Sequence, residues 1–375
     1  MHHRIVLTGG GTGGHIYPAL AVAEQLADDD DVEAILYIGA NGHLEEKLAR
    51  ERGLNFLGLK VSGMPRGLSP ALVTWPFQTF GALVEAINVV RRFRPTAVLG
   101  TGGYASAPPL AAAIALHVPY IIHEPDSFPG KVNKLFAPFA ALCSLGMDAA
   151  SERLPTSQDK MRRNGNPIRA SFFKSISRKT AAAQFKLSPK LPTLLVTGGS
   201  QGAQALNDSI RDALPALLAA SPQIQVLHQV GEKNIEAYRS KLDPSLVDHD
   251  RYRMLPYIDD LAVAYSMSDV TLCRAGAMTI AELTAKHKPA IFVPYPFAAQ
   301  DHQMHNGRYM EAKGCAIVIP QKALNADKLV ETVLGLLHDD VKLQSMQKAA
   351  QSMSKPNAAR DIATQLKKLG ELSQG

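Results

Sequence analysis

The sequence has few cysteines and no long apolar run. Its three cysteines, Cys143, Cys273 and Cys315, are too few and too scattered for a disulfide framework or a zinc site, which favours a reducing compartment. No segment approaches the roughly 20 apolar residues that a membrane-spanning helix needs. The first residues pass directly into a strand-like segment, without the apolar region of a signal peptide. We therefore expect a cytoplasmic protein with no transmembrane segment.

Charge of either sign is also modest. The formal net charge of the 375 residues is +6. Residues 1–165 hold 15 Lys and Arg against 15 Asp and Glu, whereas residues 166–375 hold 25 against 19. The basic excess of the second half suits an anionic ligand. No basic stripe with interleaved aromatics, zinc finger or helix-turn-helix signature is present, so nucleic acid is not expected as a partner.

Strand-like and helix-like segments alternate along almost the whole chain, which predicts an α/β protein with parallel sheets. The strand-like segments are rich in Val, Ile and Leu without polar alternation, as in sheets covered on both faces. The chain is longer than one hydrophobic core usually supports. The Asn-Gly and Asn-Pro steps of RRNGNPIR indicate a hinge. We expect Rossmann-like domains over residues 1–165 and 166–355, with a helix near 356–372 that packs back on the first.

Three glycine-rich loops follow strand-like segments: TGGGTGGH (8–15), GTGGYAS (100–106) and TGGSQGA (197–203). Each stands where a strand passes into a helix, which is where open α/β sheets bind ligands. Without Cβ atoms, backbone N–H groups can approach a phosphate or sugar closely, and a helix N-terminus adds partial positive charge. Together the loops indicate a phosphate-bearing ligand, with tight turns packed on neighbouring helices as the alternative.

The first loop has the Gly-x-Gly-x-x-Gly spacing of a dinucleotide fingerprint, but a Rossmann dehydrogenase also needs an acidic residue after its second strand. The second strand-like segment is followed by Ala-Asn-Gly-His at residues 40–43, with no carboxylate. A nicotinamide-dependent oxidoreductase is therefore disfavoured. Glu282, at the end of CRAGAMTIAE (273–282), could accept hydrogen bonds from a ribose diol. The alternative is that Glu282 is a solvated glutamate on a helix.

Seven motifs resemble, in order, those of the MurG family of N-acetylglucosaminyltransferases: TGGGTGGH, GTGGYAS, HEPDSFPG, GNPIR, TGGSQGA, CRAGAMTIAE and DHQMHN. The resemblance implies a GT-B fold, in which two Rossmann-like domains face each other across a cleft and the second holds most of the donor. It implies an inverting transfer of N-acetylglucosamine from UDP to the 4-hydroxyl of undecaprenyl-diphospho-N-acetylmuramoyl-pentapeptide, the step from lipid I to lipid II. That step belongs to peptidoglycan synthesis and hence to cell wall biogenesis, cell shape and cell division.

The resemblance also implies a set of donor contacts. The second-domain loops would bind the diphosphate, the uracil, the ribose and the sugar through Ser200, Gln201, Gly202, Ile258, Arg274, Ala277, Met278, Thr279, Glu282 and Gln303. Further donor contacts fall on Arg169 and, from the first domain, on Thr12, Gly13 and Gly14. No cofactor is expected besides the donor substrate. No Asp-x-Asp follows a strand as in metal-dependent glycosyltransferases, and Asp259 and Asp260 are interpreted as solvated residues at a helix start, so no metal is expected.

Glycosyl transfer needs a base for the attacking hydroxyl and a stabilised diphosphate leaving group. His15, which closes the first glycine loop, is the first candidate for the base, and a histidine that merely orders the loop is the alternative. Glu124 and His123, in HEPD, are second candidates, and His123 fits a packed histidine slightly better.

The resemblance places Tyr104 and Asn133 near the acceptor. The family usually has His-Glu-Gln-Asn where this chain has His-Glu-Pro-Asp, ending at Asp126. An ionised Asp accepts hydrogen bonds but cannot donate them, so a donor contact made by Asn must be remade or lost. We therefore rank Asp126 below the other residues that the resemblance suggests.

The acceptor implied by the family is embedded in the inner leaflet, so the first domain needs a surface for anionic headgroups. Residues 68–95 are the candidate, because an apolar and aromatic group precedes an arginine group: Leu72, Trp75, Phe77, Phe80, Arg91, Arg92 and Arg94. Core packing through Leu83, Ile87 and Val90 is an equal alternative. We expect a peripheral protein on the cytoplasmic face of the membrane, with cell-wall synthesis proteins as further partners.

Two other functions stay open at this point. A related two-domain transferase could glycosylate diacylglycerol or another lipid carrier, and the HEPD variant and the lipid-facing segment are compatible with that. The second alternative is a nucleotide-sugar-binding protein without catalytic activity, although the presence of His15 and Glu124 favours an enzyme.

Overall fold

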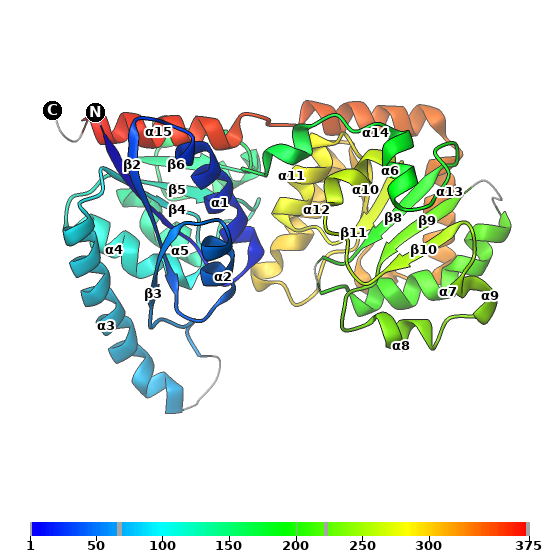
Figure 1. The fold of residues 1–375 in the computed structure, drawn as a ribbon, viewed down its shortest axis with the longest axis horizontal. Coiled ribbons are helices and arrows are strands. Elements are labelled where there is room, and N and C mark those ends of the chain that lie inside the picture. Colours follow the sequence, from blue (N-terminus) through cyan, green and yellow to red (C-terminus); the bar gives the residue numbers. More distant parts are fainter. Residues whose placement is uncertain (1, 66–69, 200, 221–223, 373–375) are drawn as a thin grey trace. The chain divides into compact units, whose positions relative to one another are not determined.

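The structure, a computed structural model, describes residues 2–65, 70–199, 201–220 and 224–372. The chain forms two compact units (Figure 1). Unit 1 comprises Met1–Arg169 together with Lys355–Gly375, and unit 2 comprises Ala170–Ser354. The sequence placed the domain change at residue 165, and the division in the structure falls after Arg169.

Unit 1 is built on a parallel sheet of seven strands in the order β3-β2-β1-β4-β5-β6-β7. Their bounds are β1 (His3–Thr8), β2 (Val32–Ala40), β3 (Asn55–Leu59), β4 (Ala97–Gly100), β5 (Tyr120–Glu124), β6 (Leu142–Leu145) and β7 (Met161–Arg162). The strand order reverses between β1 and β4, where Thr8 pairs with Gly100. The first two glycine loops thus leave adjacent strands at the switch point, where doubly wound sheets bind ligands.

Helices cover both faces of this sheet. One face packs on α1 (Gly13–Ala27) and the C-terminal α15 (Ala358–Leu372), which lie side by side (Figure 1). The other face packs on α3 (Pro70–Phe93), α4 (Ala107–Ala115) and α5 (Lys131–Phe136). The remaining helices are α2 (Leu44–Glu51), η1 (Tyr104–Ser106), η2 (Ala137–Phe139), η3 (Asp148–Glu152) and η4 (Gln158–Lys160). This double cover explains the continuous apolar strands of the sequence.

Unit 2 repeats the plan with six parallel strands in the order β10-β9-β8-β11-β12-β13. They are β8 (Thr193–Thr197), β9 (Gln225–Gln229), β10 (Tyr252–Leu255), β11 (Val270–Cys273), β12 (Ala290–Phe292) and β13 (Ala316–Val318). The order reverses between β8 and β11, where Thr197 pairs with Cys273. The loops TGGSQGA and CRAGAMTIAE therefore leave adjacent strand ends.

The helices of unit 2 include α7 (Gln204–Ala220) and α13 (Ala326–Leu337), which share one apolar core with the sheet. The others are α6 (Arg178–Gln184), α8 (Ile235–Arg239), α9 (Pro244–Val247), α10 (Leu261–Met267), α11 (Ala277–Ala285), α12 (His302–Ala312), α14 (Asp340–Ser352), η5 (Ala170–Phe173), η6 (Ala299–Asp301) and η7 (Gln321–Ala323). The predicted α/β class with two parallel, Rossmann-like sheets is confirmed. Within the described residues, every helix is too short or too polar to cross a bilayer.

Candidate active site

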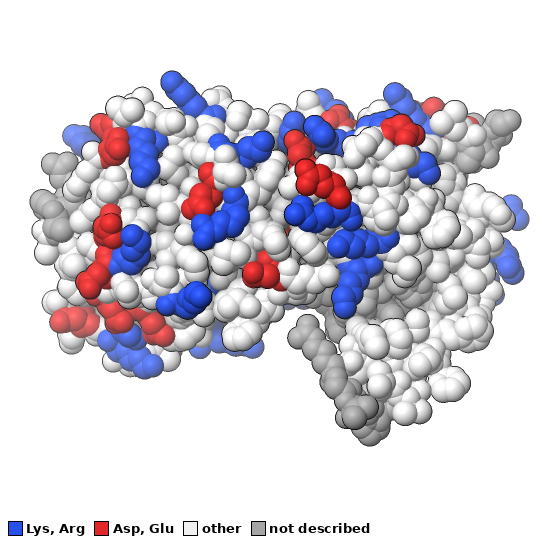
Figure 2. Space-filling view, turned by 180° about the vertical axis from the view of Figure 1, so that it is seen from behind, with Lys and Arg blue, Asp and Glu red and all other residues white. Residues whose placement is uncertain are grey.

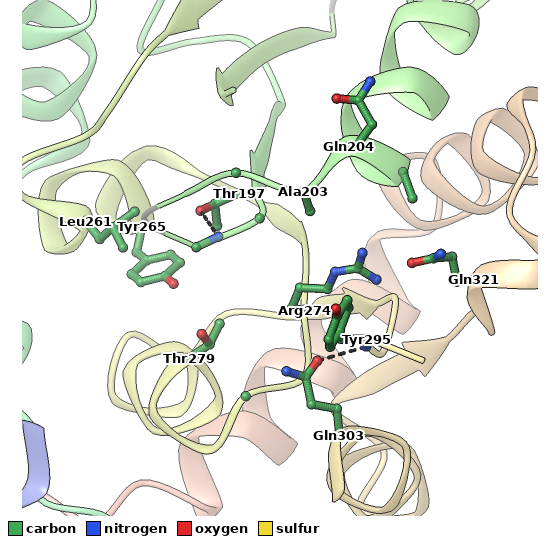
Figure 3. A pocket seen from close by; sticks show the side chains of 15 residues that line it. Thr197, Ala203, Gln204, Leu261, Tyr265, Arg274, Thr279, Tyr295, Gln303 and Gln321 are labelled. Carbon is green, nitrogen blue, oxygen red and sulfur yellow. Dashed lines mark hydrogen bonds between the residues drawn. The ribbon is translucent and has the colours of Figure 1, made fainter. Parts of the chain in front are cut away.

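A pocket of about 510 Å³ lies in unit 2 at the carboxyl ends of β8 and β11 (Figure 3). Four predicted donor residues line it: Gly202, Arg274, Thr279 and Gln303. Ile258, Ala277, Met278, Glu282 and Gln201 do not line it, and Ser200 lies outside the described residues. The rest of the lining comes from the end of β8, the glycine loop and the first turn of α7, from the turn after β11, from α10 and from the segments after β12 and β13: Thr197, Gly198, Gly199, Ala203, Gln204, Ala205, Gly276, Leu261, Tyr265, Tyr295 and Gln321.

The glycine loop of unit 2 requires its glycines for steric reasons. Gly202 has φ +73°, and a Cβ there would lie 2.0 Å from the carbonyl oxygen of Val230. A Cβ on Gly198 would lie 2.3 Å from the amide nitrogen of Ala203. The loop can therefore fold tightly against β9 and lead into α7 at Gln204. The N-terminus of α7 then adds partial positive charge beside the pocket, as an anionic diphosphate requires.

Arg274 and Gln303 are held by the same short segment after β12. The Arg274 guanidinium donates through Nη1 to the carbonyl oxygens of Val293, at 2.9 Å, and Pro294, at 3.2 Å. It also lies over the Tyr295 ring, 5.5 Å from the centroid. Gln303 Oε1 accepts a 2.9 Å hydrogen bond from the Tyr295 N–H, so its amide nitrogen points to the opposite side (Figure 3). These contacts place one cation and one amide donor in the pocket.

Gln229, which the sequence did not single out, ties two donor loops together. Its buried amide donates to Gly199 O at 2.8 Å and accepts from the Ile258 N–H at 3.0 Å. The N–H of Ile258 is therefore already engaged, so the predicted backbone contact to uracil would have to use the Ile258 carbonyl. The only sequence signal was a Gln at the end of an apolar strand.

Glu282, on α11, accepts a 3.5 Å hydrogen bond from the Tyr265 hydroxyl instead of lining the pocket.

In unit 1, His15 stands in the first turn of α1 between the two glycine loops. Its Nδ1 lies 3.2 Å from Gly10 O and 3.3 Å from Thr12 Oγ1. A Cβ on Gly102 would lie only 3.0 Å from His15 Cδ2, so the imidazole packs directly on the second loop. A carbonyl oxygen only accepts, so the contact with Gly10 places a proton on Nδ1 and the lone pair on Nε2. That tautomer is the one a general base needs.

Glu124 ends β5 and is fully buried. Its carboxylate accepts hydrogen bonds from the Asp126 N–H at 3.0 Å, the Gly130 N–H at 3.0 Å and Asn133 Nδ2 at 2.8 Å. Burial raises the pKa of Glu124, and the nearby Asp126 carboxylate raises it further. Three donors on one buried carboxylate favour a role in closing the loop 125–130 over a role in proton transfer.

His123 is also fully buried, with both ring nitrogens engaged. Nδ1 lies 3.1 Å from Ser144 Oγ, and Nε2 lies 2.9 Å from Asn166 Oδ1. Burial lowers the pKa of His123 to about 4, so the ring is neutral near pH 7. This arrangement favours the packed histidine, the alternative raised by the sequence.

The other residues predicted near the acceptor surround the same strand ends. Asn133 Nδ2 also donates to His123 O at 3.1 Å. The Asn133 Oδ1 atom is buried and has no hydrogen-bond partner among the described residues. The Tyr104 hydroxyl lies 3.4 Å from His43 Nδ1. Asp126 is half-buried beside the carboxylate that its N–H contacts. The exposed end of the first loop leads into α1 through Thr12, Gly13 and Gly14. Arg169 is the last residue of the segment Met1–Arg169 of unit 1 and is half-buried.

Glu45 is a buried carboxylate that the sequence missed. It follows β2 in the first turn of α2, accepts a 3.3 Å hydrogen bond from the Ala40 N–H and is 0% exposed. A Cβ on Gly10 would lie 2.2 Å from Glu45 Oε1, so the side chain supports the first glycine loop from beneath. Glu45 lies just beyond residues 40–43, where the sequence shows no carboxylate, and its side chain is fully buried. Elsewhere, the described residues contain no group of three or more His, Cys, Asp or Glu side chains that could hold a metal ion.

Comparisons with known proteins agree with this architecture. Residues 5–143 match the N-terminal domain of glycosyltransferase family 28, and residues 193–366 match its C-terminal domain. The UDP-N-acetylglucosamine--N-acetylmuramyl-(pentapeptide) pyrophosphoryl-undecaprenol N-acetylglucosamine transferase of Halothermothrix orenii is 38% identical over 365 residues, covering 96% of this chain and 97% of the relative. The protein of the same name from Syntrophus aciditrophicus is 36% identical, with 96% of each chain covered.

Solved structures show the same relationship. The crystal structure of Acinetobacter baumannii MurG has a TM-score of 0.77 at 25% identity and covers 98% of this chain and 100% of that chain. A Staphylococcus aureus MnaA–UDP structure has a TM-score of 0.68 at 15% identity, with 96% and 94% covered, which shows a shared fold alone. These similarities confirm the family resemblance and the GT-B fold that the sequence predicted.

Proposed function

The chain belongs to glycosyltransferase family 28, and we propose that it transfers N-acetylglucosamine from UDP to the 4-hydroxyl of undecaprenyl-diphospho-N-acetylmuramoyl-pentapeptide. The product of this step is lipid II, and the reaction inverts the anomeric carbon. The observation that carries the proposal is the pocket at the switch point of unit 2, beside the N-terminus of α7.

The donor diphosphate binds to the glycine loop of unit 2 in this proposal. As the glycosidic bond to UDP breaks, negative charge grows on the β-phosphate. Backbone N–H groups of the glycine loop, the α7 N-terminus and the Arg274 guanidinium would stabilise that charge, which their position at the pocket supports. Because Arg274 is already fixed by two carbonyl groups and by Tyr295, it loses little freedom when the donor binds.

His15 is the proposed general base. Its lone pair on Nε2 would take the proton of the attacking 4-hydroxyl, and its Nδ1 would keep the hydrogen bond to Gly10 throughout. Glu124 and Asn133 then act as the loop support beside it. Asn133 packs near the same Gly102 backbone as His15, since a Cβ on Gly102 would lie 3.3 Å from Asn133 Nδ2.

The membrane contact falls on α3 in this proposal. Four apolar side chains stand on one face, at spacings of four, three and four residues, and are exposed by 71% (Val73), 78% (Phe77), 68% (Phe80) and 43% (Val84). The surface over the N-terminal half of α3 is uncharged (Figure 2). Exposed Arg91 and Arg92 follow in the last turn and suit anionic headgroups.

The opposite face of α3 packs on unit 1 through Ala82, Ala86 and Val90. Trp75, which the sequence placed among the lipid-facing residues, is half-buried and donates through Nε1 to Ser62 O at 3.1 Å. The apolar residues of α3 are thus divided between the core and an exposed face, which supports a membrane contact alongside core packing. The protein would bind peripherally to the cytoplasmic face of the membrane.

The proposal is tested with radiolabelled UDP-N-acetylglucosamine and three acceptor conditions: lipid I, diacylglycerol and no lipid. We expect label to enter the lipid fraction only with lipid I. Transfer to diacylglycerol would assign a different carrier, and binding of UDP-N-acetylglucosamine without any transfer would indicate a nucleotide-sugar-binding protein.

A further inference from the structure

A continuous path of side-chain hydrogen bonds crosses unit 1 from the C-terminal helix to the loop after β5. It begins at Gln365 on α15, which exchanges two hydrogen bonds with Asn164. Asn164 Nδ2 donates to Gln365 Oε1 at 3.0 Å, and Gln365 Nε2 donates to Asn164 Oδ1 at 3.2 Å. Asn164 Nδ2 also donates to Ser144 Oγ, on β6, at 3.0 Å. The two partners Asn164 and Gln365 are 201 residues apart in sequence.

The path continues through His123 and has one consistent direction. Asn166 Nδ2 donates to Pro125 O at 3.0 Å, which places its Oδ1 opposite His123 Nε2 and requires the proton on Nε2. His123 Nδ1 then accepts from the Ser144 hydroxyl, whose oxygen in turn accepts from Asn164. Each donor on the path faces an acceptor, and only one tautomer of His123 is compatible with this arrangement.

Burial makes this path sensitive to the loss of any member. His123 and Ser144 are 0% exposed, Asn166 is 6% exposed and Asn164 is 9% exposed. A buried polar group that loses its partner cannot recover a hydrogen bond from water, so the neighbours must rearrange. Gln365 is the half-buried end of the path and can be changed without opening the sheet.

The other end of the path lies at the expected acceptor site. Pro125 begins the loop that Glu124 closes through its hydrogen bonds to the Asp126 and Gly130 N–H groups. Gly146, at the end of β6, makes room for this junction, because a Cβ there would lie 2.1 Å from Asn166 Oδ1. The loop is thus fixed once by Glu124 and once, through Asn166, by the path from α15.

We propose that Gln365 is a positioning residue for the acceptor substrate. Through Asn164 it orients the Ser144 hydroxyl toward His123 Nδ1, and the His123 ring in turn holds Asn166 and the loop that begins at Pro125. The substrate it serves is the lipid-linked sugar, so this inference rests on the proposed function. The C-terminal helix is then part of the acceptor site, although it contributes no group that touches the acceptor.

The first test compares Gln365→Leu with Thr364→Leu, an exposed neighbour on the same helix. The KM values for lipid I and for UDP-N-acetylglucosamine are measured together with kcat. We expect Gln365→Leu to raise the acceptor KM about tenfold, since one or two hydrogen bonds are lost, with the donor KM unchanged. Gln365→Glu, which keeps the acceptor oxygen for Asn164, should give an intermediate value. Equal acceptor KM values for Gln365→Leu and Thr364→Leu would overturn the proposal.

The second test does not depend on turnover. Nitrogen NMR of labelled imidazoles, with the His123 signals assigned from His123→Gln, reports whether Nδ1 accepts a hydrogen bond. We expect a hydrogen-bonded Nδ1 in the parent protein and in Thr364→Leu, and a weakened or lost hydrogen bond at Nδ1 in Gln365→Leu and Ser144→Ala. If the Nδ1 signal is the same in all four proteins, the path does not control His123. If the parent protein transfers no sugar but the Nδ1 signal changes in these variants as expected, the proposed function is refuted and this positioning stands.

Discussion

Asn133 Nδ2 donates a 2.8 Å hydrogen bond to Glu124 Oε2, which closes the loop 125–130 between the end of β5 and the first turns of α5. The Glu124 carboxylate also accepts hydrogen bonds from the Asp126 and Gly130 N–H groups, so residues 124–133 form a closed ring. The ring sits at the carboxyl edge of the sheet, beside the packed His15. Its integrity depends on a buried carboxylate that keeps all its donors.

Replacing Asn133 should open that ring. Asn133→Leu removes the donor to Glu124 and leaves the buried carboxylate short of one partner, so we expect a loss of about 2 kcal/mol in the free energy of unfolding. Urea denaturation of Asn133→Leu and of Asn88→Leu, at an exposed position on α3, provides the comparison. An equal stability for the two variants would contradict the anchoring role.

Removing the proposed base should affect chemistry more than binding. His15→Ala should lower kcat by on the order of 10²-fold or more, the usual contribution of a general base, and leave the affinity for UDP-N-acetylglucosamine within several-fold. Steady-state kinetics with lipid I and calorimetric titration with the donor measure the two quantities. His338→Ala, exposed in unit 2, serves as the control. Unchanged turnover would remove His15 from the mechanism.

The glycine loop of unit 2 can be tested with a matched pair of Gly→Ala changes. At Gly202 the new Cβ would collide with Val230 O at 2.0 Å, and the φ of +73° is itself unfavourable for alanine. At Gly335, in α13, a Cβ meets nothing within 4 Å. We expect Gly202→Ala to weaken UDP binding at least tenfold by displacing the loop, and Gly335→Ala to bind normally and gain about 0.5–1 kcal/mol of stability. Calorimetric titration and thermal unfolding distinguish the two.

The exposed face of α3 should carry membrane binding. Phe77→Glu combined with Phe80→Glu removes two large apolar side chains, each worth about 1.5–3 kcal/mol on full burial, and adds charge that anionic lipid repels. We expect the variant to lose binding to anionic vesicles in flotation by at least tenfold while its melting temperature is kept. Val341→Glu, 81% exposed in unit 2, should float like the parent. A folded double variant that floats normally would exclude this face.

Acidification should destabilise the protein through its buried histidines. Burial lowers the pKa of His123 to about 4, below its ordinary value near 6.5, so the unfolded chain takes up a proton between these pH values and the folded chain does not. This contribution is present above pH 6.5 and is lost as pH falls toward 4, by about 3 kcal/mol in all. Urea titrations across this range should show a shallower fall for His123→Gln. Burial lowers the pKa of His228 to about 3, which acts with the same sign, and raises the pKa of Glu124, which acts with the opposite sign. The contribution of His123 is therefore the difference between the slopes of the two proteins.

The sequence was sufficient for all the strands except β3 and β7, for the strand ends that carry the glycine loops and for the family, because each of these depends on local composition and spacing. It could not identify Gln229, Glu45 or Gln365, whose roles come from partners that are distant in the chain or approach from beneath a loop. It also could not separate a proton-transfer role for His123 from a packed one. That distinction depends on Ser144 and Asn166, which lie 21 and 43 residues away.

Residues 170–354 form one uninterrupted stretch, whereas unit 1 is completed only by the segment from Lys355 onward. A ribosome therefore produces all of unit 2 before it produces α15, and domains fold largely as they emerge. Until then the nascent chain presents the apolar flank of α1 that Ile362 and Leu366 later cover. Unit 1, which is expected to meet the lipid, is therefore the first to leave the ribosome in part and the last to be completed.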